Sequence, residues 1–387
     1  MSILHSNNKG FQSSTAEVVD SWYLVCQFFP RGGYGLLSSV HAGSNALPKI
    51  GDGSPAASAV TSHAGRRMPA ELGIGGGLVT EDPLVLRFTA APGHLLRRAQ
   101  QVHTDYWSRE VHEGVTGPQY ATVVAVAGWP EVDQKLAGEL ASLDKSTIAG
   151  VVSRLEKKGW LTRRRDPQDG RRRLLMLTDS AHARLPALTL DAEQVQQLLL
   201  APLSASDRPD FVSLLQRVAF PDSGPIGPAP RRDVPTLEMG TTPGYLIRRA
   251  QQNHAASWTD WLGGDLTSTQ YAVLTAIATS PDDAVDQAMI GARASLDSSS
   301  VTDIVARLAE RGWITRDRDP VDRRRMRVSL SNPAMTAMRH LTRSVEQVQK
   351  ELLRALDKDE KMRFVSLMQR VALIHRKTPE SVPAESA

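Results

Sequence analysis

Six arginines fall within a short stretch of this chain, at a spacing that suits the binding of a polyanion. They occupy positions 163–165 and 171–173, on either side of the sequence Asp-Pro-Gln-Asp-Gly, whose acids are Asp166 and Asp169. Such a density of positive charge is hard to fold against itself and attracts a polyanion such as a phosphate backbone. For one hairpin taken alone, a solvated basic surface loop is an equally good explanation.

The residues before these arginines predict a helix. Asp144 suits an N-cap, because its carboxylate accepts hydrogen bonds from the free amides of a first turn. Gly159 is placed to end the helix in the left-handed conformation. Helical spacing predicts one buried face, made of Ile148, Val151, Val152 and Leu155. The opposite face carries small or hydrogen-bonding residues that suit a groove, namely Lys145, Ser146, Ala149, Gly150, Ser153 and Arg154.

Two strands are expected after this helix, at 160–165 and 172–177, because Asp-Pro-Gln-Asp-Gly between them is a strong turn signal. A helix sized for the major groove beside an arginine-tipped hairpin is the outline of a winged helix-turn-helix. The same arrangement recurs at 296–330, which argues against a chance surface loop.

The repeat extends far beyond this motif. Pro92-Gly-His-Leu-Leu-Arg-Arg-Ala-Gln-Gln matches Pro243-Gly-Tyr-Leu-Ile-Arg-Arg-Ala-Gln-Gln, 151 positions later (243 − 92). Phe211-Val-Ser-Leu-Leu-Gln-Arg-Val-Ala returns as Phe364-Val-Ser-Leu-Met-Gln-Arg-Val-Ala, 153 positions later (364 − 211). The chain therefore holds two copies of a whole domain rather than of a motif.

These residues resemble the MarR family of bacterial transcription regulators. The likeness is carried by Leu155-Glu-Lys-Lys-Gly-Trp-Leu-Thr-Arg with Asp166-Pro-Gln-Asp-Gly-Arg-Arg-Arg, and by Leu308-Ala-Glu-Arg-Gly-Trp-Ile-Thr-Arg with Asp319-Pro-Val-Asp-Arg-Arg-Arg. It covers residues 88–220 and 241–375. It implies a mainly α fold with small β-wings, in which two tandem winged helix-turn-helix domains form a pseudo-dimer. It also implies a sequence-specific regulator that binds double-stranded DNA, most often a repressor.

The repeat and the composition together give a domain map. Residues 1–84 are rich in Gly, Ser, Ala and His and lack periodicity, so we expect a disordered extension, within which Met68 is a candidate natural start. The rest divides into a first domain at 85–220, a Pro- and Gly-rich linker at 221–241, a second domain at 242–375 and a flexible tail at 376–387.

Local signals place the other helices of each copy. First helices are expected at 94–112 and 246–262, and first helix-turn-helix helices at 133–140 and 286–293. Capping boxes start further helices at Thr116–Gln119, Thr267–Gln270 and Asp357–Glu360. Thr178 and Asn332 are the expected caps of the helix after each hairpin, and a helix begins near Ser204.

The resemblance carries DNA contacts onto particular residues. The recognition helices would contribute Lys145, Ser146, Thr147, Ser153 and Arg154 in the first copy, and Ser298, Ser299, Ser300, Thr302 and Arg307 in the second. The hairpins would probe the minor groove with Arg171, Arg172, Arg324 and Arg325, since a narrow minor groove attracts arginine. The alternative for Arg154 and Arg307 is an ion pair within the fold, to Asp169 and Asp322 respectively. Trp160 and Trp313 are expected in the core.

The two copies are not equivalent in charge. The second copy has Ser298 in place of Lys145 and Asp303 in place of Gly150, and it carries Asp317 in its hairpin. A carboxylate facing DNA either accepts from a cytosine amino group or repels phosphate. We therefore expect an imperfect palindrome as the operator. A ligand-sensing or protein-interaction module in which one copy has lost DNA binding is the alternative.

An effector site is the second expectation that the resemblance brings. Members of the family are released from DNA by small aromatic or phenolic anions. Aromatic or imidazole side chains agree between the copies at His103, Trp107 and Tyr120 and at His254, Trp258 and Tyr271. An aromatic core with a satisfied histidine explains these positions as well. A charged partner for an anion would come from Arg97, Arg98, Arg248 or Arg249.

Other classes of function find little support. The only cysteine, Cys26, lies outside both repeats, so neither a disulfide framework nor a cysteine-based metal site is expected. No P-loop, nucleophile elbow, dinucleotide fingerprint or metal spacing is present, which predicts neither an enzyme nor a cofactor. The apolar run 22–29 is too short for a membrane helix and lacks the basic start of a signal peptide. We expect a cytoplasmic protein with no membrane partner.

Overall fold

The computed structural model of the chain describes residues 86–129, 132–222, 235–264, 266–280, 285–319 and 326–372. The N-terminal extension, the middle of the linker and the C-terminal tail lie outside these ranges, and so do the expectations of disorder made for them. Arg324 and Arg325 at the tip of the second hairpin also lie outside the described residues.

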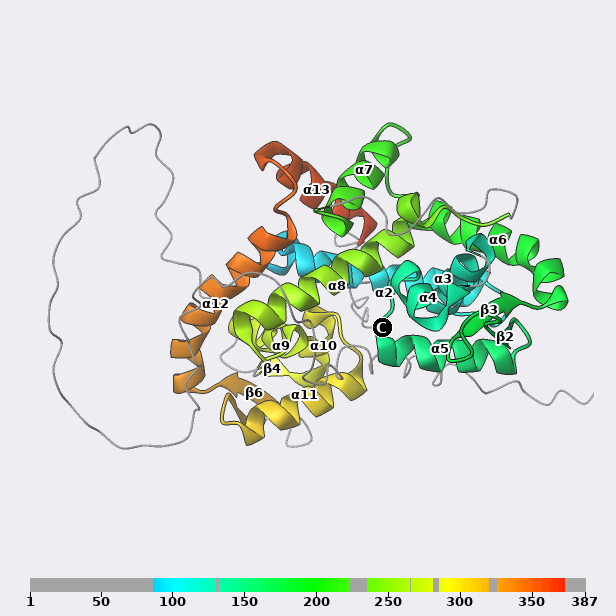
Figure 1. Ribbon diagram of the computed structural model, residues 1–387. Coiled ribbons are helices and arrows are strands. Elements are labelled where there is room, and N and C mark those ends of the chain that lie inside the picture. The colour runs from blue at the N-terminus through cyan, green and yellow to red at the C-terminus, as the bar shows by residue number, and fades with distance from the viewer. Residues whose placement is uncertain are drawn as a thin grey trace, which may run out of the picture. The chain divides into compact units, whose positions relative to one another are not determined.

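Each repeat has the same order of elements (Figure 1). The first repeat consists of η1 (Phe88–Ala90), α2 (Pro92–Glu110), α3 (Gly117–Gly128), β1 (Val132–Asp133), α4 (Gln134–Leu140), α5 (Lys145–Lys157), β2 (Leu161–Arg165), β3 (Arg173–Leu177), α6 (Asp179–Leu200) and α7 (Asp207–Ala219). The second consists of η2 (Met239–Thr241), α8 (Pro243–Leu262), α9 (Ser268–Ala278), β4 (Val285–Asp286), α10 (Gln287–Ala294), α11 (Ser298–Glu310), β5 (Ile314–Arg318), β6 (Met326–Leu330), α12 (Asn332–Leu352) and α13 (Lys358–Val371).

Two small antiparallel sheets form the wings, with strand orders β1-β3-β2 and β4-β6-β5. In the first sheet Leu161 pairs with Leu177 and Arg165 with Arg173, so the hairpin turns between Arg165 and Arg173. A strand on the far side, β1, ties the sheet to the start of α4. The mainly α fold with two winged helix-turn-helix domains is therefore confirmed.

The helix starts follow the capping signals of the sequence, with one exception. Thr116 and Thr267 form capping boxes with Gln119 and Gln270, as expected. The expected cap at Asn332 is wrong, because Ser331 accepts the hydrogen bond from the amide of Ala334 and Asn332 is already inside α12. Ser331 keeps the extended backbone that a cap needs, and Pro333 follows within the first helical turn, where its missing N–H costs nothing.

Each repeat encloses its own apolar core beneath the wing. Trp160 is fully buried in the first core and Trp313 is 6% exposed in the second, which confirms both tryptophans as core residues. The guanidinium of Arg184 lies 4.3 Å from the Trp160 ring and also pairs with Glu113, closing the helix–sheet junction.

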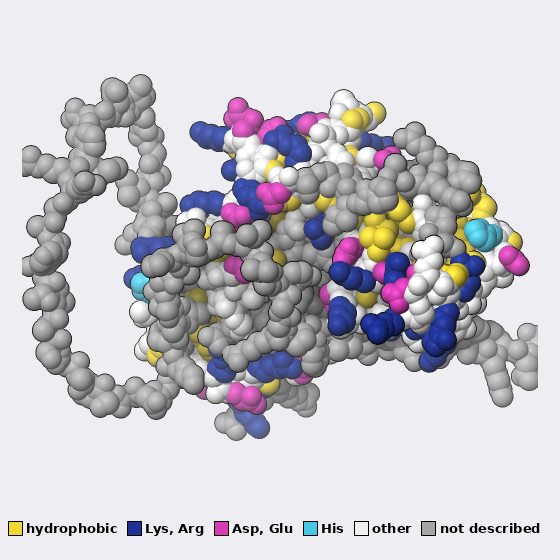
Figure 2. Space-filling model, viewed as in Figure 1, with side chains coloured by type: hydrophobic (Ala, Val, Ile, Leu, Met, Phe, Trp, Pro, Cys, Tyr) yellow, Lys and Arg dark blue, Asp and Glu magenta, His cyan; other side chains and the backbone are white. Residues whose placement is uncertain are grey.

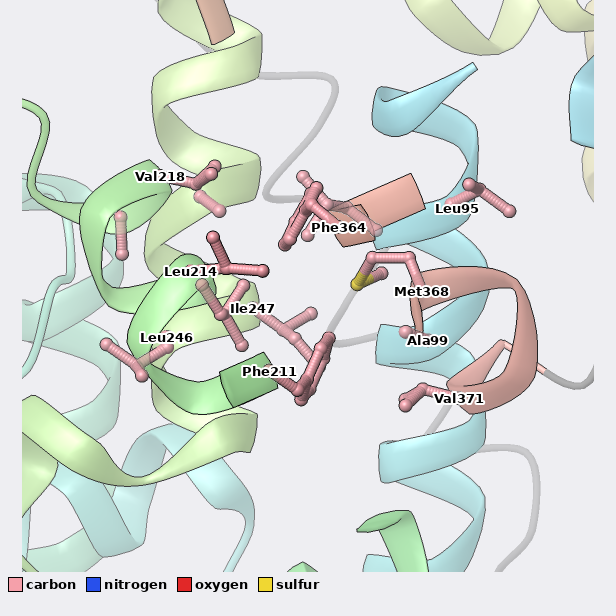
Figure 3. Close-up of a cluster of buried hydrophobic side chains, with 14 of the residues drawn as sticks. Leu95, Ala99, Phe211, Leu214, Val218, Leu246, Ile247, Phe364, Met368 and Val371 are labelled. Carbon is pink, nitrogen blue, oxygen red and sulfur yellow. The ribbon is translucent and has the colours of Figure 1, made fainter. Parts of the chain in front are cut away.

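A third core is built by residues of both repeats. It gathers apolar side chains of α2 and α7 from the first repeat and of α8 and α13 from the second (Figure 3). Phe211 and Phe364 stack in its middle with ring centroids 6.3 Å apart and planes 11° from parallel. Burial of this apolar surface joins the repeats by the same hydrophobic effect that folds each of them.

The end of the expected linker is packed rather than extended. The hydroxyl of Thr189 donates to the carbonyl of Pro235 at 2.9 Å, and the amide of Leu237 donates to the hydroxyl of Tyr120 at 3.2 Å. The segment that leads into the second repeat therefore lies on the first. Leu86 makes the equivalent backbone hydrogen bond to Tyr271 of the second repeat.

Candidate nucleic-acid interface

The first recognition helix, α5, is fixed at its start by Asp144. This carboxylate accepts from the amides of Ser146 and Thr147 at 2.9 Å each, and from both of their hydroxyls at 2.5 Å. Burial alone would raise the pKa of Asp144, but these hydrogen bonds outweigh it and hold the pKa below its usual value. The hydroxyls of Ser146 and Thr147 are thus turned toward their own cap.

The outer face of α5 is exposed, as the sequence predicts. Its buried stripe is made of Ile148, Val151, Val152 and Leu155. Lys145, Ser153 and Arg154 are exposed on the other side. Among the described residues no ion pair joins Arg154 to Asp169, whose carboxylate accepts from the amide of Arg171. On the face seen in Figure 2, Lys and Arg side chains gather over the region that Figure 1 labels α5, β2 and β3.

Helix α11 has the same arrangement, but fewer of its polar side chains are available to contact DNA. Ser298, Ser299, Thr302 and Arg307 are exposed, but Ser300 is buried and donates to the Asp297 cap at 2.9 Å. The hydroxyl of Thr302 donates back to the carbonyl of Ser298. Asp303 and Asp317 are both exposed, so the acidic character noted in the sequence reaches the surface. The partner considered for Arg307, Asp322, lies outside the described residues.

The turn of the first wing is organised by two aspartates. Asp166 accepts from the amides of Gln168 and Asp169, and these bonds, with the charge of Arg172 nearby, lower its pKa. Asp169 accepts from the amide of Arg171 at 3.0 Å. Each carboxylate satisfies backbone donors that the hairpin leaves free, which keeps the tip in one shape.

Two arginines of the first wing form ion pairs within the fold, whereas Arg171 at its tip forms none with the described residues. Arg172 bridges Asp133 at 3.1 Å and Asp166 at 3.3 Å, and therefore holds the tip against β1. Arg163 pairs with Glu156 of α5 at 3.1 Å and ties the wing to the recognition helix. Arg171 is exposed, and within the described ranges its guanidinium has no ion pair. Arg171 is the tip side chain best placed to approach a groove.

The second wing differs in its charges. Asp317 stands opposite Arg327 across β5 and β6, and Arg327 also approaches Asp319 at 3.9 Å. Thr315 and Ser329 share a hydrogen bond of 2.7 Å on the same sheet. Asp317 stands where the first wing has Arg164 (317 − 153), so the second wing carries less positive charge on this strand.

Each helix-turn-helix is held by the first helix of the other repeat. Arg248 and Gln252 of α8 donate to the carbonyls of Ala141 and Ser142 after α4, both at 2.6 Å. Arg97 and Gln101 of α2 donate in the same way to the carbonyls of Ala294, the last residue of α10, and Ser295, which follows it, at 2.7 and 2.8 Å. We call these four contacts the inter-repeat hydrogen bonds. Ser142 and Ser295 adopt left-handed conformations, with φ of 50° and 51°, so these turns depend on support from outside.

The first repeat has one further contact of this kind. The hydroxyl of Tyr245 donates to the carbonyl of Leu140 at 3.0 Å and accepts from the hydroxyl of Ser142 at 2.7 Å. The aligned residue in the first repeat is His94, which packs on Phe88 instead. The two helix-turn-helix units are therefore supported unequally.

The expected effector residues do come together, once in each repeat. His103, Trp107 and Tyr120 form a chain of rings with successive centroids 5.6 Å apart, and His254, Trp258 and Tyr271 form another at 5.8 Å.

Several polar atoms of these rings have partners within the protein. Trp107 donates to Val115, and Tyr120 meets Thr189 at 3.2 Å. Ring packing in the core and effector binding are both compatible with this geometry.

The two histidines lie against the opposite repeat. A Cβ atom at Gly244 would sit 2.2 Å from Nε2 of His103, and one at Gly93 would sit 2.2 Å from Nε2 of His254, so both positions require glycine. Burial, and then the charge of Arg248, lowers the pKa of His103 to about 3. Burial, and then the charge of Arg97, lowers the pKa of His254 to about 4. Both imidazoles are neutral at physiological pH.

Sequence reasoning missed the inter-repeat hydrogen bonds. The sequence offers Arg97 and Arg248 as anion ligands, and nothing in it places the turn carbonyls that they reach. One signal was present, because Arg-Arg-Ala-Gln-Gln is identical in both copies while its neighbours differ. When two repeats pack against each other, polar residues that are identical in both indicate that each repeat makes the same contact to the other.

Comparison with known proteins agrees with this construction. The sequence profile of the MarR family matches residues 113–172 and 264–325. The transcriptional regulator HosA of Escherichia coli O111:H- is 34% identical over 125 residues, which is 32% of this chain and 92% of HosA. The HTH-type transcriptional repressor NicR of Pseudomonas putida is 30% identical over 135 residues, 35% of this chain and 85% of NicR.

Part of the chain is also similar to a solved structure. The PcaV transcriptional regulator of Streptomyces coelicolor, in complex with its natural ligand, is 45% identical. The match covers 35% of this chain and 96% of PcaV, with a TM-score of 0.34. Among the residues that the structure describes, no helix has the length and apolar content needed to cross a membrane.

The fold and the exposed basic helices define a DNA-binding transcription regulator of the winged helix-turn-helix class, a class of binding proteins rather than enzymes. Within that class, the chain belongs to the MarR family and carries its domain twice.

Proposed function

We propose that this chain is a sequence-specific repressor in which one molecule supplies both halves of a MarR-type dimer. The halves are the domains at 85–220 and 242–375, joined by residues 221–241. The observation that carries the proposal is the pattern of inter-repeat hydrogen bonds, in which Arg248 reaches Ala141 and Arg97 reaches Ala294. Each helix-turn-helix is supported by the other repeat, as expected if the two bind DNA as one unit. The repressor NicR, similar in sequence, supports the direction of regulation.

The proposed DNA contacts divide by groove. Lys145, Ser153 and Arg154 on α5, with Thr302 and Arg307 on α11, would enter successive major grooves. Arg171 would reach the minor groove, while Arg172 fixes the wing that carries it. Ser146 and Ser299 would contact DNA only by exchanging the hydrogen bonds that they now give to Asp144 and Asp297. The operator would be an imperfect palindrome with half-sites about 34–36 Å apart.

The test is selection of bound fragments from the host genome with the purified full-length chain. A single molecule should protect both halves of one imperfect palindrome in a footprint. Protection of a lone half-site, or binding only by two chains together, would contradict the proposal.

We also propose that a small aromatic carboxylate or phenolate is the effector. Arg248 is 8% exposed, and burial lowers the pKa of its guanidinium to about 10, so it stays charged at neutral pH. Its Nε and the Oε1 of Gln100 are buried without hydrogen-bond partners. A buried charge without a carboxylate is costly unless an anion compensates it. The adjacent rings of His103, Trp107 and Tyr120 would hold the aromatic part.

4-Hydroxybenzoate is a suitable first probe of this site. It should stabilise the chain against heat and weaken operator binding, and His103→Asn should reduce both effects. If the stabilisation persists unchanged in His103→Asn, the effector binds elsewhere.

A second candidate function is favoured by the exposed carboxylates of Asp303 and Asp317. They support the hypothesis that the second repeat senses a ligand or binds a protein and no longer binds DNA. Replacing Lys145 and Arg171 in the first repeat, and in a separate variant Arg307 and Arg316 in the second, discriminates the two functions. Loss of affinity only in the first variant would favour the sensor.

A further inference from the structure

Two pairs of aligned residues meet where the repeats pack together. In the region after residue 132 the repeats are offset by 153 positions, so Asp210 aligns with Arg363 (363 − 210) and Phe211 with Phe364. The stacked rings of Phe211 and Phe364 are therefore aligned residues that touch each other. Aligned residues can meet only where the axis that relates the two repeats passes between them.

Asp210 and Arg363 also meet at this axis. Nε of Arg363 lies 2.8 Å from Oδ2 of Asp210, and Nη2 of Arg363 lies 2.5 Å from Oδ1 of Asp207. Both side chains of the Asp210–Arg363 pair are 44% exposed. An exposed ion pair of this kind contributes little to stability by itself.

The neighbouring ion pairs behave differently under exchange of the repeats. Arg370 pairs with Asp207 at 2.6 Å, and Arg217 pairs with Glu360. Arg217 aligns with Arg370 and Asp207 with Glu360, both at the offset of 153 (370 − 217). These two pairs are symmetric copies of each other, so they would form equally well between two first repeats or two second repeats.

The axial pair cannot form in those combinations. Two first repeats from different chains would bring Asp210 against Asp210, and two second repeats would bring Arg363 against Arg363. Like charges across an interface disfavour the wrong partner more than opposite charges strengthen the right one. Asp207 adds to the penalty for a first–first pair. In the chain it binds Arg363, whereas between two first repeats it would stand beside the carboxylate of Asp210.

We propose that Asp210 and Arg363 determine which repeats pair, so that this surface accepts a first repeat only with a second repeat. The inference rests on the proposed pairing of the two domains within one chain. The linker already favours pairing within the chain by raising the local concentration. The charges of Asp210 and Arg363 add selectivity for the partner. They disfavour pairs of two first repeats or two second repeats from different chains, which would otherwise link chains into open assemblies.

The test uses the full chain with a protease site inserted at 223–234 and cut after folding. The nicked protein is held at low salt in mild denaturant, so that its halves exchange partners. Native mass spectrometry then resolves first–first, first–second and second–second pairs by mass. The variants are Arg363→Asp, Asp210→Arg and the double swap of both. Arg109→Asp is the matched control, because Arg109 pairs with Asp105 on the surface of α2 alone.

The nicked wild type should contain first–second pairs in roughly tenfold or greater excess over the statistical mixture. Each single reversal should bring the distribution close to statistical, because all combinations then place like charges on the axis. The double swap should restore the excess, and Arg109→Asp should leave it unchanged. Circular dichroism confirms that each variant is folded, and the double swap has the same composition as the wild type.

Three outcomes would overturn the proposal: a statistical mixture in the wild type, an unchanged excess in the single variants, or no recovery in the double swap. If the halves separate and form no pairs at all, the pairing of domains within the chain fails as well. If first–second pairs dominate but the intact chain binds no operator, the proposed function fails while the role of Asp210 and Arg363 stands.

Discussion

Arg248 in the second repeat donates a hydrogen bond of 2.6 Å to the carbonyl of Ala141, which ends the first helix of the helix-turn-helix in the first repeat. The carbonyls at a helix end lack partners within the helix and carry partial negative charge. A buried guanidinium therefore both satisfies and orients this end. The position of the helix-turn-helix in the first repeat therefore depends on a residue of the second repeat.

The first prediction concerns this contact. Arg248→Met should weaken operator binding by roughly tenfold, because it removes about 1–3 kcal/mol of coupling between the two repeats. The dependence of affinity on salt should stay the same, since a buried residue touches no phosphate. Measuring binding at several salt concentrations separates the two effects. Arg109→Met is the matched control, because Arg109 pairs with Asp105 on the exposed surface of α2 and should leave affinity nearly unchanged.

The second prediction separates the two arginines at the first wing tip. Arg171→Ala should lower the salt slope of operator binding by about one, because a cation in the minor groove neutralises phosphate charge and displaces a counterion. Arg172→Ala should weaken binding further and also increase amide exchange at the wing, because Arg172 braces Asp133 and Asp166. Arg109→Ala on α2 is the control. An equal salt slope in Arg171→Ala and the wild type would remove this wing from the DNA contacts.

A third prediction exchanges the charges of the two recognition helices. Gly150→Asp should weaken operator binding by about tenfold, because a carboxylate on the outer face of α5 repels phosphate. The new side chain has room, since a Cβ atom there lies 3.4 Å from the guanidinium of Arg154, which is exposed. Asp303→Gly in the second repeat should strengthen binding. Gly150→Ala, which adds bulk without charge, should have little effect in the same titration.

Local features of this site were predictable from the sequence because they depend on neighbours in the chain. The Asp144 cap, the buried stripe of α5 and the left-handed Gly159 (φ 72°) were all confirmed. The cap at Ser331 was missed by one residue, because serine and asparagine both cap helices well and adjoin here. The repeat itself was visible as near-identical strings of residues.

Features that depend on the crossing of distant helices were not predictable. Arg172 was expected to point into DNA, but β1 brings Asp133 beside it, and no local pattern places these residues together. The inter-repeat hydrogen bonds require α8 to lie against the turn after α4. The exclusion of any side chain at Gly93 and Gly244 follows only from histidines that lie in the opposite repeat.

The final prediction concerns pH and the buried histidines. In the folded chain the pKa is about 3 for His103 and about 4 for His254, against about 6.5 in an unfolded chain. Between these values the unfolded chain binds more protons, so the free energy of unfolding falls as the pH drops below about 6.5. Each histidine should cost about 1 kcal/mol between pH 7 and 5.5.

Urea denaturation at a series of pH values measures this loss. His103→Asn and His254→Asn should each flatten the dependence between pH 7 and 5.5, and the exposed His182→Asn should leave it unchanged. Because each buried imidazole contacts a glycine of the opposite repeat and lies near its arginine, protonation would place two cations in one buried junction. Acid should therefore loosen the junction between the repeats before it unfolds either wing. Amide exchange at Gly93 and Gly244, which lie at the junction, should rise at a higher pH than amide exchange in β2 and β5.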